Sequence, residues 1–339
     1  MTAAFTAAAA VAHFAEASPL LTFGLATVAL AGLAWIVSFA TEQVGQRYGP
    51  AVTGVLQSTL GNLPEFFIVI FALAEGNLIV ARASILGSIF ANALLVLGIV
   101  IVAGCHASAD GVMRFHTRLP KDNAVLVLLT SFLIVLIGLS AATEDNASHH
   151  IEAISIVGAI ALLLTYGVWL NDYLRSDLPS MAVEGAPRVS MRLALALLAA
   201  AGVGAAFVSD WFVTALNPAV DALNLSQAFA GLVIVAIAGN AVENVVGIQL
   251  AARNRTDYAL SVILQSPVQI ALVLAPVLVL GAPLVGATFT LVLSPILIAV
   301  LVLAVLVTTV VVFDAESNWL EGVALIVLYC LCATAFYWG

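Results

Sequence analysis

The sequence predicts an all-α polytopic membrane protein, with ten transmembrane helices arranged as two inverted five-helix repeats. Hydrophobic residues make up 63% of the 339 residues and charged residues only 9%, far from the composition of a soluble domain. The apolar residues gather in segments of about 20 residues, the length that crosses a bilayer as a helix. A polar motif of the first half returns in the second half. Composition therefore leaves no room for a soluble domain.

The segments that meet the length and apolarity of a spanning helix define the expected elements in chain order. They are residues 20–40, 51–74, 78–103, 123–141, 151–170, 191–209, 225–252, 257–282, 286–313 and 320–338. Residues 1–17 contain no Lys or Arg, so they lack the basic region of a secretory signal. They are also short for a span, and we expect a lead-in segment or an interfacial helix there.

The basic residues predict how the helices are oriented. Nine of the ten Lys and Arg residues fall in alternate loops, those after the first, third, fifth and seventh helices, and only Arg82 falls on the other face. By the positive-inside rule these loops are cytoplasmic. Both termini are then periplasmic, as in a multi-pass protein of a bacterial inner membrane. The net charge of −9 argues against a nucleic-acid partner.

An internal repeat divides the chain into two halves. The pentapeptide GNLPE at residues 61–65 returns as GNAVE at residues 239–243, an offset of 178, and the same offset aligns Ser88 with Ser266. An odd number of helices per repeat turns the second copy over in the membrane, which is a transporter architecture. The predicted organisation is a first repeat over 18–175, a cytoplasmic linker over 176–190 and a second repeat over 191–339.

Polar residues in four of these segments recur at steps of three or four, so each set shares one helix face. Such residues inside a membrane face the protein interior or a water-filled cavity. Pro64 has no N–H and frees the backbone carbonyl of Leu60, four residues earlier. The candidate cation ligands are Glu65, Glu243, Asn62, Asn240, Ser88, Asn92, Ser266, Gln269 and the carbonyl of Leu60.

Carboxylate, amide, hydroxyl and carbonyl groups are hard oxygen ligands, which suit Ca²⁺ better than a soft metal. Glu65 and Glu243 cannot lie close together, both ionised, with nothing between them. The site therefore has two favourable states, with either a divalent cation or protons on the two carboxylates. We expect these glutamates to couple cation to proton, with Ca²⁺ as cargo and no cofactor.

These motifs resemble the two repeats of the calcium/cation antiporter superfamily, and within it the calcium/proton exchanger (CAX) branch, as a divergent member. GNLPEFFIVIFAL and LGSIFANALLVLG correspond to the first repeat, and GNAVENVV and SPVQIALVLAPVLVL to the second. The resemblance implies that Glu65 and Glu243 exchange the cation for protons. It also implies that the polar residues of the third and eighth helices complete the site. The chain departs from the family at Gln57, Asn244 and Gln265.

The leading hypothesis is a secondary antiporter that exports Ca²⁺ from the cytoplasm in exchange for H⁺ by alternating access. A Na⁺/H⁺ or Mn²⁺/H⁺ exchanger of the same fold is the near alternative, since the family's His after the second motif glutamate is here Asn244. A cation channel is the alternative of another class, and the doubled, inverted site argues against it. We expect no enzyme, because no HExxH motif is present. No obligatory protein partner is evident.

Overall fold

The computed structural model describes residues 1–45, 47, 59–116, 118–175 and 187–338, and the side chains of Val242 and Glu243 are not described. Its contacts separate two compact units. Unit 1 comprises Met1–Ser84, Asp172–Glu243 and Phe336–Gly339, and unit 2 comprises Ile85–Asn171 and Asn244–Ala335. Each unit thus takes residues from both predicted repeats.

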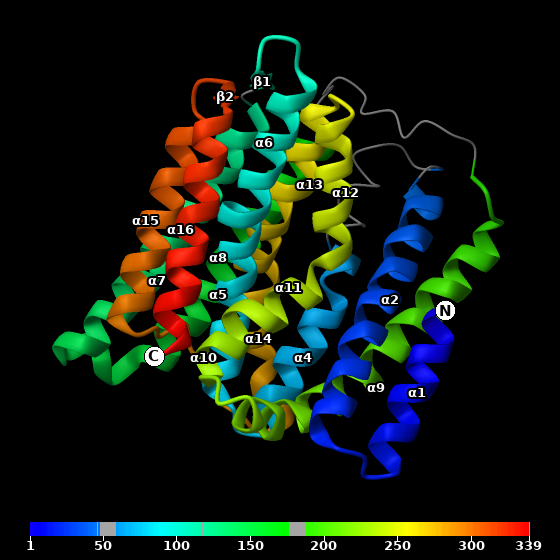
Figure 1. Ribbon diagram of the computed structural model, residues 1–339. Helices are drawn as coiled ribbons and strands as arrows, with labels where there is room; N and C mark the ends of the chain where they lie inside the picture. The colour runs from blue at the N-terminus through cyan, green and yellow to red at the C-terminus, as the bar shows by residue number, and fades with distance from the viewer. Residues whose placement is uncertain (46, 48–58, 117, 176–186, 339) are drawn as a thin grey trace. The chain divides into compact units, whose positions relative to one another are not determined.

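Helices account for nearly all of the first half, and short π segments or turns interrupt several of them (Figure 1). In chain order the elements are α1 (Thr2–Phe14), α2 (Pro19–Gly45), α4 (Leu63–Ala74), α5 (Leu78–Phe90), the π-helix η1 (Ala91–Val96), α6 (Leu97–Ala107), β1 (Val112–Arg114), α7 (Arg118–Thr143), the 3-10 helix η2 (Asn146–His150) and α8 (Ile151–Arg175).

The second half is built in the same way, with two further π segments. Its elements are α9 (Met191–Ala222), α10 (Gln227–Phe229), the π-helix η3 (Ala230–Val235), α11 (Ala236–Gly239), α12 (Ala241–Ala252), α13 (Thr256–Gln269), the π-helix η4 (Ile270–Leu274), α14 (Ala275–Gly281), the 3-10 helix η5 (Ala282–Val285), α15 (Pro295–Val311), β2 (Glu316–Asn318) and α16 (Trp319–Tyr337).

The structure confirms the polytopic helical fold but not the count of ten spans. Among the described residues, seven helical stretches are long and apolar enough to cross a bilayer, or eight if the broken stretch from 227 to 252 is one span. The predicted span 51–74 runs partly outside the described residues. The predicted span 286–313 is shorter, because Gly286 has a φ of 72° and ends η5, and the helix resumes only at Pro295.

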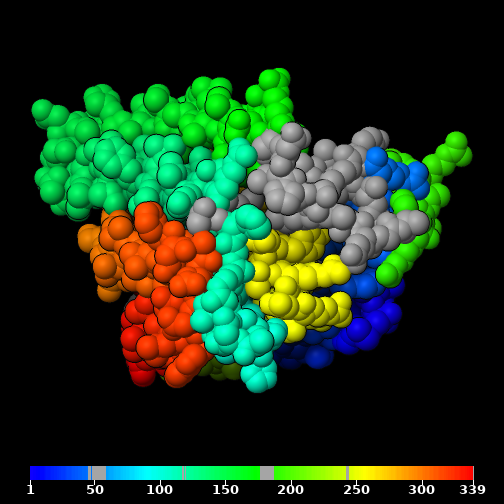
Figure 2. Space-filling model, turned by 90° about the horizontal axis from the view of Figure 1, so that it is seen from above, coloured from blue at the N-terminus to red at the C-terminus, as the bar shows by residue number. Residues whose placement is uncertain are grey.

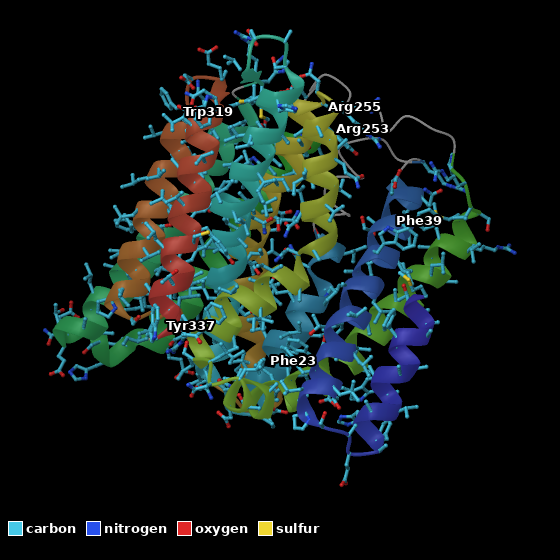
Figure 3. The ribbon with its side chains drawn as sticks, viewed as in Figure 1. Phe23, Phe39, Arg253, Arg255, Trp319 and Tyr337 are labelled. Atoms are coloured by element: carbon cyan, nitrogen blue, oxygen red, sulfur yellow. The ribbon has the colours of Figure 1, made fainter. Side chains whose placement is uncertain are left out.

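In unit 1, α2 packs along α9, and α1 lies against α2 (Figure 1). A side chain at Gly32 would meet the Thr2 side chain at 2.8 Å, so the glycine permits close packing of α1. Phe23, near one end of α2, packs against Phe212 of α9 with ring centroids 4.9 Å apart, and Phe39 lies near the other end (Figure 3). Residues 2–14 therefore form a packed helix, where the sequence left a lead-in or an interfacial helix open.

In unit 2, small residues bring helices into backbone contact. A Cβ on Gly98 of α6 would lie 2.6 Å from the carbonyl oxygen of Gly322 of α16, and the reverse substitution is equally tight at 2.7 Å. Contacts of this kind are common between membrane helices because small residues let the backbones approach closely.

The strands β1 and β2 pair antiparallel at one end of unit 2, and Figure 2 shows their segments side by side in teal and orange. In the adjoining turn, Arg114 donates to Asp110 at 2.6 Å. This bond, with further donors from Ser108 and Val112, lowers the pKa of Asp110 to about 2. Trp319, Arg253 and Arg255 lie at the same end of the unit (Figure 3), as aromatic and basic residues do near a membrane surface.

Candidate cation-binding site

Each of the two GN motifs interrupts a helix. In the first motif, residues 59–61 are helical, Asn62 forms a turn, and α4 begins at the next residue. In the second motif, α11 ends at Gly239, Asn240 forms the turn, and α12 begins at Ala241. The glycine before each asparagine tolerates such local unwinding because it has no side chain. Breaks of this kind at membrane depth are tolerated only inside protein or beside a water-filled cavity.

The helix break puts the motif glutamate into the first turn of the following helix. Glu65 is the third residue of α4 and is 0% exposed. Glu243 is likewise the third residue of α12 by backbone position, and its side chain lies outside the described part. The N-terminus of a helix carries a partial positive charge that favours an anionic side chain. Both motifs therefore place their glutamate, by backbone position, in the first turn of the following helix.

Within unit 1 the two motifs meet. A Cβ on Gly239 would lie 3.6 Å from the Cβ of Glu65, an ordinary van der Waals distance. Asn62 and Asn240 are both buried there. The structure thus brings the second motif's glycine against the first motif's carboxylate residue, although 174 positions separate them in the chain (239 − 65).

Ser209 of α9 contributes a contact that the sequence did not single out. Its hydroxyl is buried and donates to the backbone carbonyl of Pro64 at 3.4 Å. This bond occupies the carbonyl one residue before Glu65 and fixes the first turn of α4 against α9. The only sequence signal was a serine in the apolar stretch ending at residue 209.

The prediction for Leu60 rested on a continuous helix through Pro64. The structure instead has the break at Asn62, and Pro64 lies in the first turn of α4, a position that proline tolerates well. The Leu60 carbonyl therefore lies near the end of the helical residues 59–61. The last carbonyls of a helix have no donor within the helix. Pro64, four residues later, has no N–H to offer that carbonyl, so the helix end and the proline both favour a free Leu60 carbonyl.

Within unit 2, the polar residues of α5–η1 and α13 contact each other. The side-chain amide of Asn92 donates to the hydroxyl of Ser266 at 3.3 Å and to the carbonyl of Ser88 at 3.0 Å. All three residues are 0% exposed. The Asn92 Oδ1 atom is buried without a hydrogen-bond partner among the described residues. The two predicted polar stripes therefore come together through this amide.

Gln269 is held by a residue that the sequence did not predict. Its Nε2 donates to the hydroxyl of Tyr166 of α8 at 3.1 Å, and both side chains are buried. Tyr166 in turn lies against Trp169, with ring centroids 5.6 Å apart. A tyrosine in an apolar helix is usually read as an interfacial anchor, so only the fold could connect it to Gln269.

The three amides share one arrangement. In Asn92, Asn240 and Gln269 the NH₂ end donates to a protein acceptor, which for Asn240 is the Ala236 carbonyl at 2.9 Å. The donor end fixes the orientation of each amide, and its oxygen is the end that can coordinate a cation. Across the described residues, no three His, Cys, Asp or Glu side chains gather into a metal-binding group. A cation here would depend on few carboxylates and on neutral oxygens.

A polytopic helical protein with a GN motif at a helix break in each half has the architecture of a secondary ion transporter. The sequence model of the family described as "Sodium/calcium exchanger protein" matches residues 18–171 and 193–338, and the chain belongs to that family. The matched ranges contain both GN motifs and every candidate ligand.

The relatives of this chain are similar over nearly its whole length. A vacuolar calcium ion transporter of Schizosaccharomyces pombe is 31% identical over 330 residues, covering 93% of this chain and 79% of the relative. A Ca²⁺/H⁺ antiporter of Aphanothece halophytica is 30% identical over 345 residues, covering 96% and 91%. The crystal structure of the Ca²⁺/H⁺ antiporter protein YfkE matches with a TM-score of 0.84 at 27% identity, covering 100% of this chain and 98% of that one.

Proposed function

We propose that the protein is a Ca²⁺/H⁺ antiporter that exports Ca²⁺ from the cytoplasm in exchange for protons. The observation that carries the proposal is the pair of GN motifs, each with its glutamate in the first turn of a helix and with Gly239 against Glu65. The named activities of the relatives agree with it: one is a calcium ion transporter and two are Ca²⁺/H⁺ antiporters. A Na⁺/H⁺ or Mn²⁺/H⁺ exchanger, or a channel, has no such support.

In this proposal Glu65 and Glu243 carry either the cation or protons. A divalent cation balances two ionised carboxylates in a low-dielectric site, whereas two bare carboxylates repel each other. Neutral oxygens fill the rest of the shell, because Ca²⁺ takes six to eight oxygen ligands. We assign these to Asn62, Asn240, Ser88, Asn92, Ser266, Gln269 and the Leu60 carbonyl. The protein itself makes and breaks no covalent bond in this cycle, so we propose a transporter and not an enzyme.

We also propose that the two inverted repeats, residues 18–175 and 191–339, alternate access to this site. The linker 176–190 is cytoplasmic in this scheme, and both termini are periplasmic, as the distribution of basic residues favours. Single cysteines placed in the linker and at the C-terminus of a cysteine-free variant check the orientation. If a membrane-impermeant thiol reagent labels the linker in intact cells, the orientation is the opposite of the one proposed.

Everted membrane vesicles that contain the protein and a pH-sensitive dye test the activity. After acidification of the lumen, added Ca²⁺ should release protons from the vesicles, and equal additions of Mn²⁺, Na⁺ and K⁺ should release fewer. Vesicles without the protein provide the baseline. Proton release on addition of Na⁺ alone would show that the cargo is Na⁺ and not Ca²⁺. Cation flux that continues without proton movement would indicate a channel.

Replacing Tyr166 by phenylalanine should raise the apparent KM for the cation about 2- to 10-fold and leave kcat nearly unchanged. The substitution removes the acceptor of the Gln269 amide, and a neutral hydrogen bond contributes about 0.5–1.5 kcal/mol, which is roughly a 2- to 10-fold change in affinity. The matched control is Tyr173→Phe, which removes the hydroxyl of another buried tyrosine of α8. An unchanged KM in Tyr166→Phe would remove Gln269 from the ligand set.

A further inference from the structure

Unit 2 contains a small cavity that the proposed exchange site does not use. Its volume is about 40 Å³, and α5, η1, α7, α13 and α15 all contribute to its wall. The wall is mostly apolar, and none of the candidate cation ligands with a described side chain lines it. Ala93 and Pro267 do line it, and each follows a polar residue of the Asn92–Ser266 pair in the chain. The cavity therefore lies beside the two helices that carry this pair.

One polar side chain of the wall stands out. Asn123 of α7 is 3% exposed, and both its Nδ2 and its Oδ1 are buried without a hydrogen-bond partner among the described residues. A buried amide that makes no hydrogen bond is strongly destabilising, so such groups normally bond to protein or to ordered water. Asn123 lies in the cavity wall, so a ligand in the cavity can supply what the amide needs.

The other polar groups of the wall define the ligand. Thr308 of α15 donates its hydroxyl to the carbonyl of Ala93 in η1 at 3.2 Å, and Thr309 donates to Val305 at 2.7 Å. These hydroxyls can still accept a hydrogen bond. The described residues of the wall include no acidic or basic side chain, so an ion would be unbalanced there. A water molecule needs roughly 10–15 Å³ and two to four polar partners, which the cavity offers.

We propose that this cavity is an internal water site, in which a cluster of about two or three water molecules binds the Asn123 amide and reaches the Thr308 hydroxyl. Water can enter because the pocket is only partly enclosed. The cluster also gives η1 exchangeable hydrogen-bond partners. A π segment needs such partners if its backbone is to rearrange, because lipid offers none.

Radiolytic hydroxyl-radical labelling of the full-length protein in detergent tests the site. Radicals form from bound water in place, so buried side chains beside ordered water are oxidised even though bulk solvent does not reach them. Leu264 and Pro267 line the cavity, whereas Ile263 is also buried on the same helix and is not among the described lining residues. We expect labelling of Leu264 and Pro267 to exceed that of Ile263 several-fold. Equal labelling of all three in the wild-type protein would overturn the proposal.

A substitution then ties the water to the amide. Asn123→Leu keeps a similar shape but removes both polar atoms, and it should reduce labelling of Leu264 and Pro267 to the level of Ile263. Asn123→Ser retains one hydroxyl and should preserve the labelling. Thr130→Val is the matched control, because it removes a buried hydroxyl from the same helix outside the cavity. Labelling that persists in Asn123→Leu would show that Asn123 does not hold the water.

Discussion

Replacing Glu65 by glutamine is expected to reduce Ca²⁺-driven proton release by about 100-fold or more, while the protein still folds and inserts. Glutamine keeps the shape of the side chain but removes its charge and its titratable proton. Removing one partner of a buried charge pair costs about 3–5 kcal/mol, and each 1.4 kcal/mol is tenfold in binding. Proton release from everted vesicles measures the effect, and Glu243→Gln should behave in the same way.

The chain offers a matched control on the same helix. Glu75 follows the last residue of α4, is exposed, and accepts a hydrogen bond from Thr214 at 3.3 Å. Glu75→Gln should retain most of the exchange activity. Folding of each variant is checked by its elution as a single species in detergent. If Glu65→Gln or Glu243→Gln transports at the wild-type rate in a protein that is folded, that glutamate is not a ligand.

Acid should weaken cation binding without reducing the number of cations bound. If cation and protons share the two carboxylates, each proton bound removes negative charge from the cation's shell, and cation binding must release protons. Lowering the pH therefore raises the apparent Kd for Ca²⁺, and raising the pH lowers it until both carboxylates are ionised. The steepness of this dependence reports the number of protons released.

Calorimetric titration of the purified protein in buffers of different ionisation enthalpy counts these protons directly. We expect a count between zero and two that rises as the pH falls. The Glu65→Gln variant should release fewer protons per cation that it still binds. Cation binding that releases no protons at any pH would show that protons use other groups.

The sequence predicted the burial of the polar residues because each lies in an otherwise apolar segment. Asn62, Glu65 and Asn240 are buried as expected, since hydrocarbon leaves a polar group no other favourable place. The helix break at each asparagine has only a partial signal in the sequence. A Gly-Asn pair permits a break, but the stability of the alternative helix depends on packing around it, which no local pattern records.

Other features left no local signal. The π segments η1, η3 and η4 lie in apolar stretches whose hydrophobicity does not distinguish π from α turns. The Tyr166–Gln269 bond joins residues 103 positions apart, so it requires the fold. The compact units also cross the repeat boundary, because each takes residues from both repeats, and helices α5, α8, α12 and α16 each contribute residues to both units. The sequence repeats reflect common descent and the order of the helices, whereas the compact units reflect how the helices pack.

The contact between Gly98 and Gly322 has a mechanical consequence for α6. Two helix backbones in contact at a glycine pair cannot shift lengthwise past each other unless they first separate, because the side chains on either side would collide. We therefore expect the α6 and α16 helices to move together as one rigid pair. If the helix that carries Ser88 and Asn92 is displaced, either the α6–α16 pair moves with it or the chain bends in η1. The regular α-helical hydrogen bonding is interrupted there.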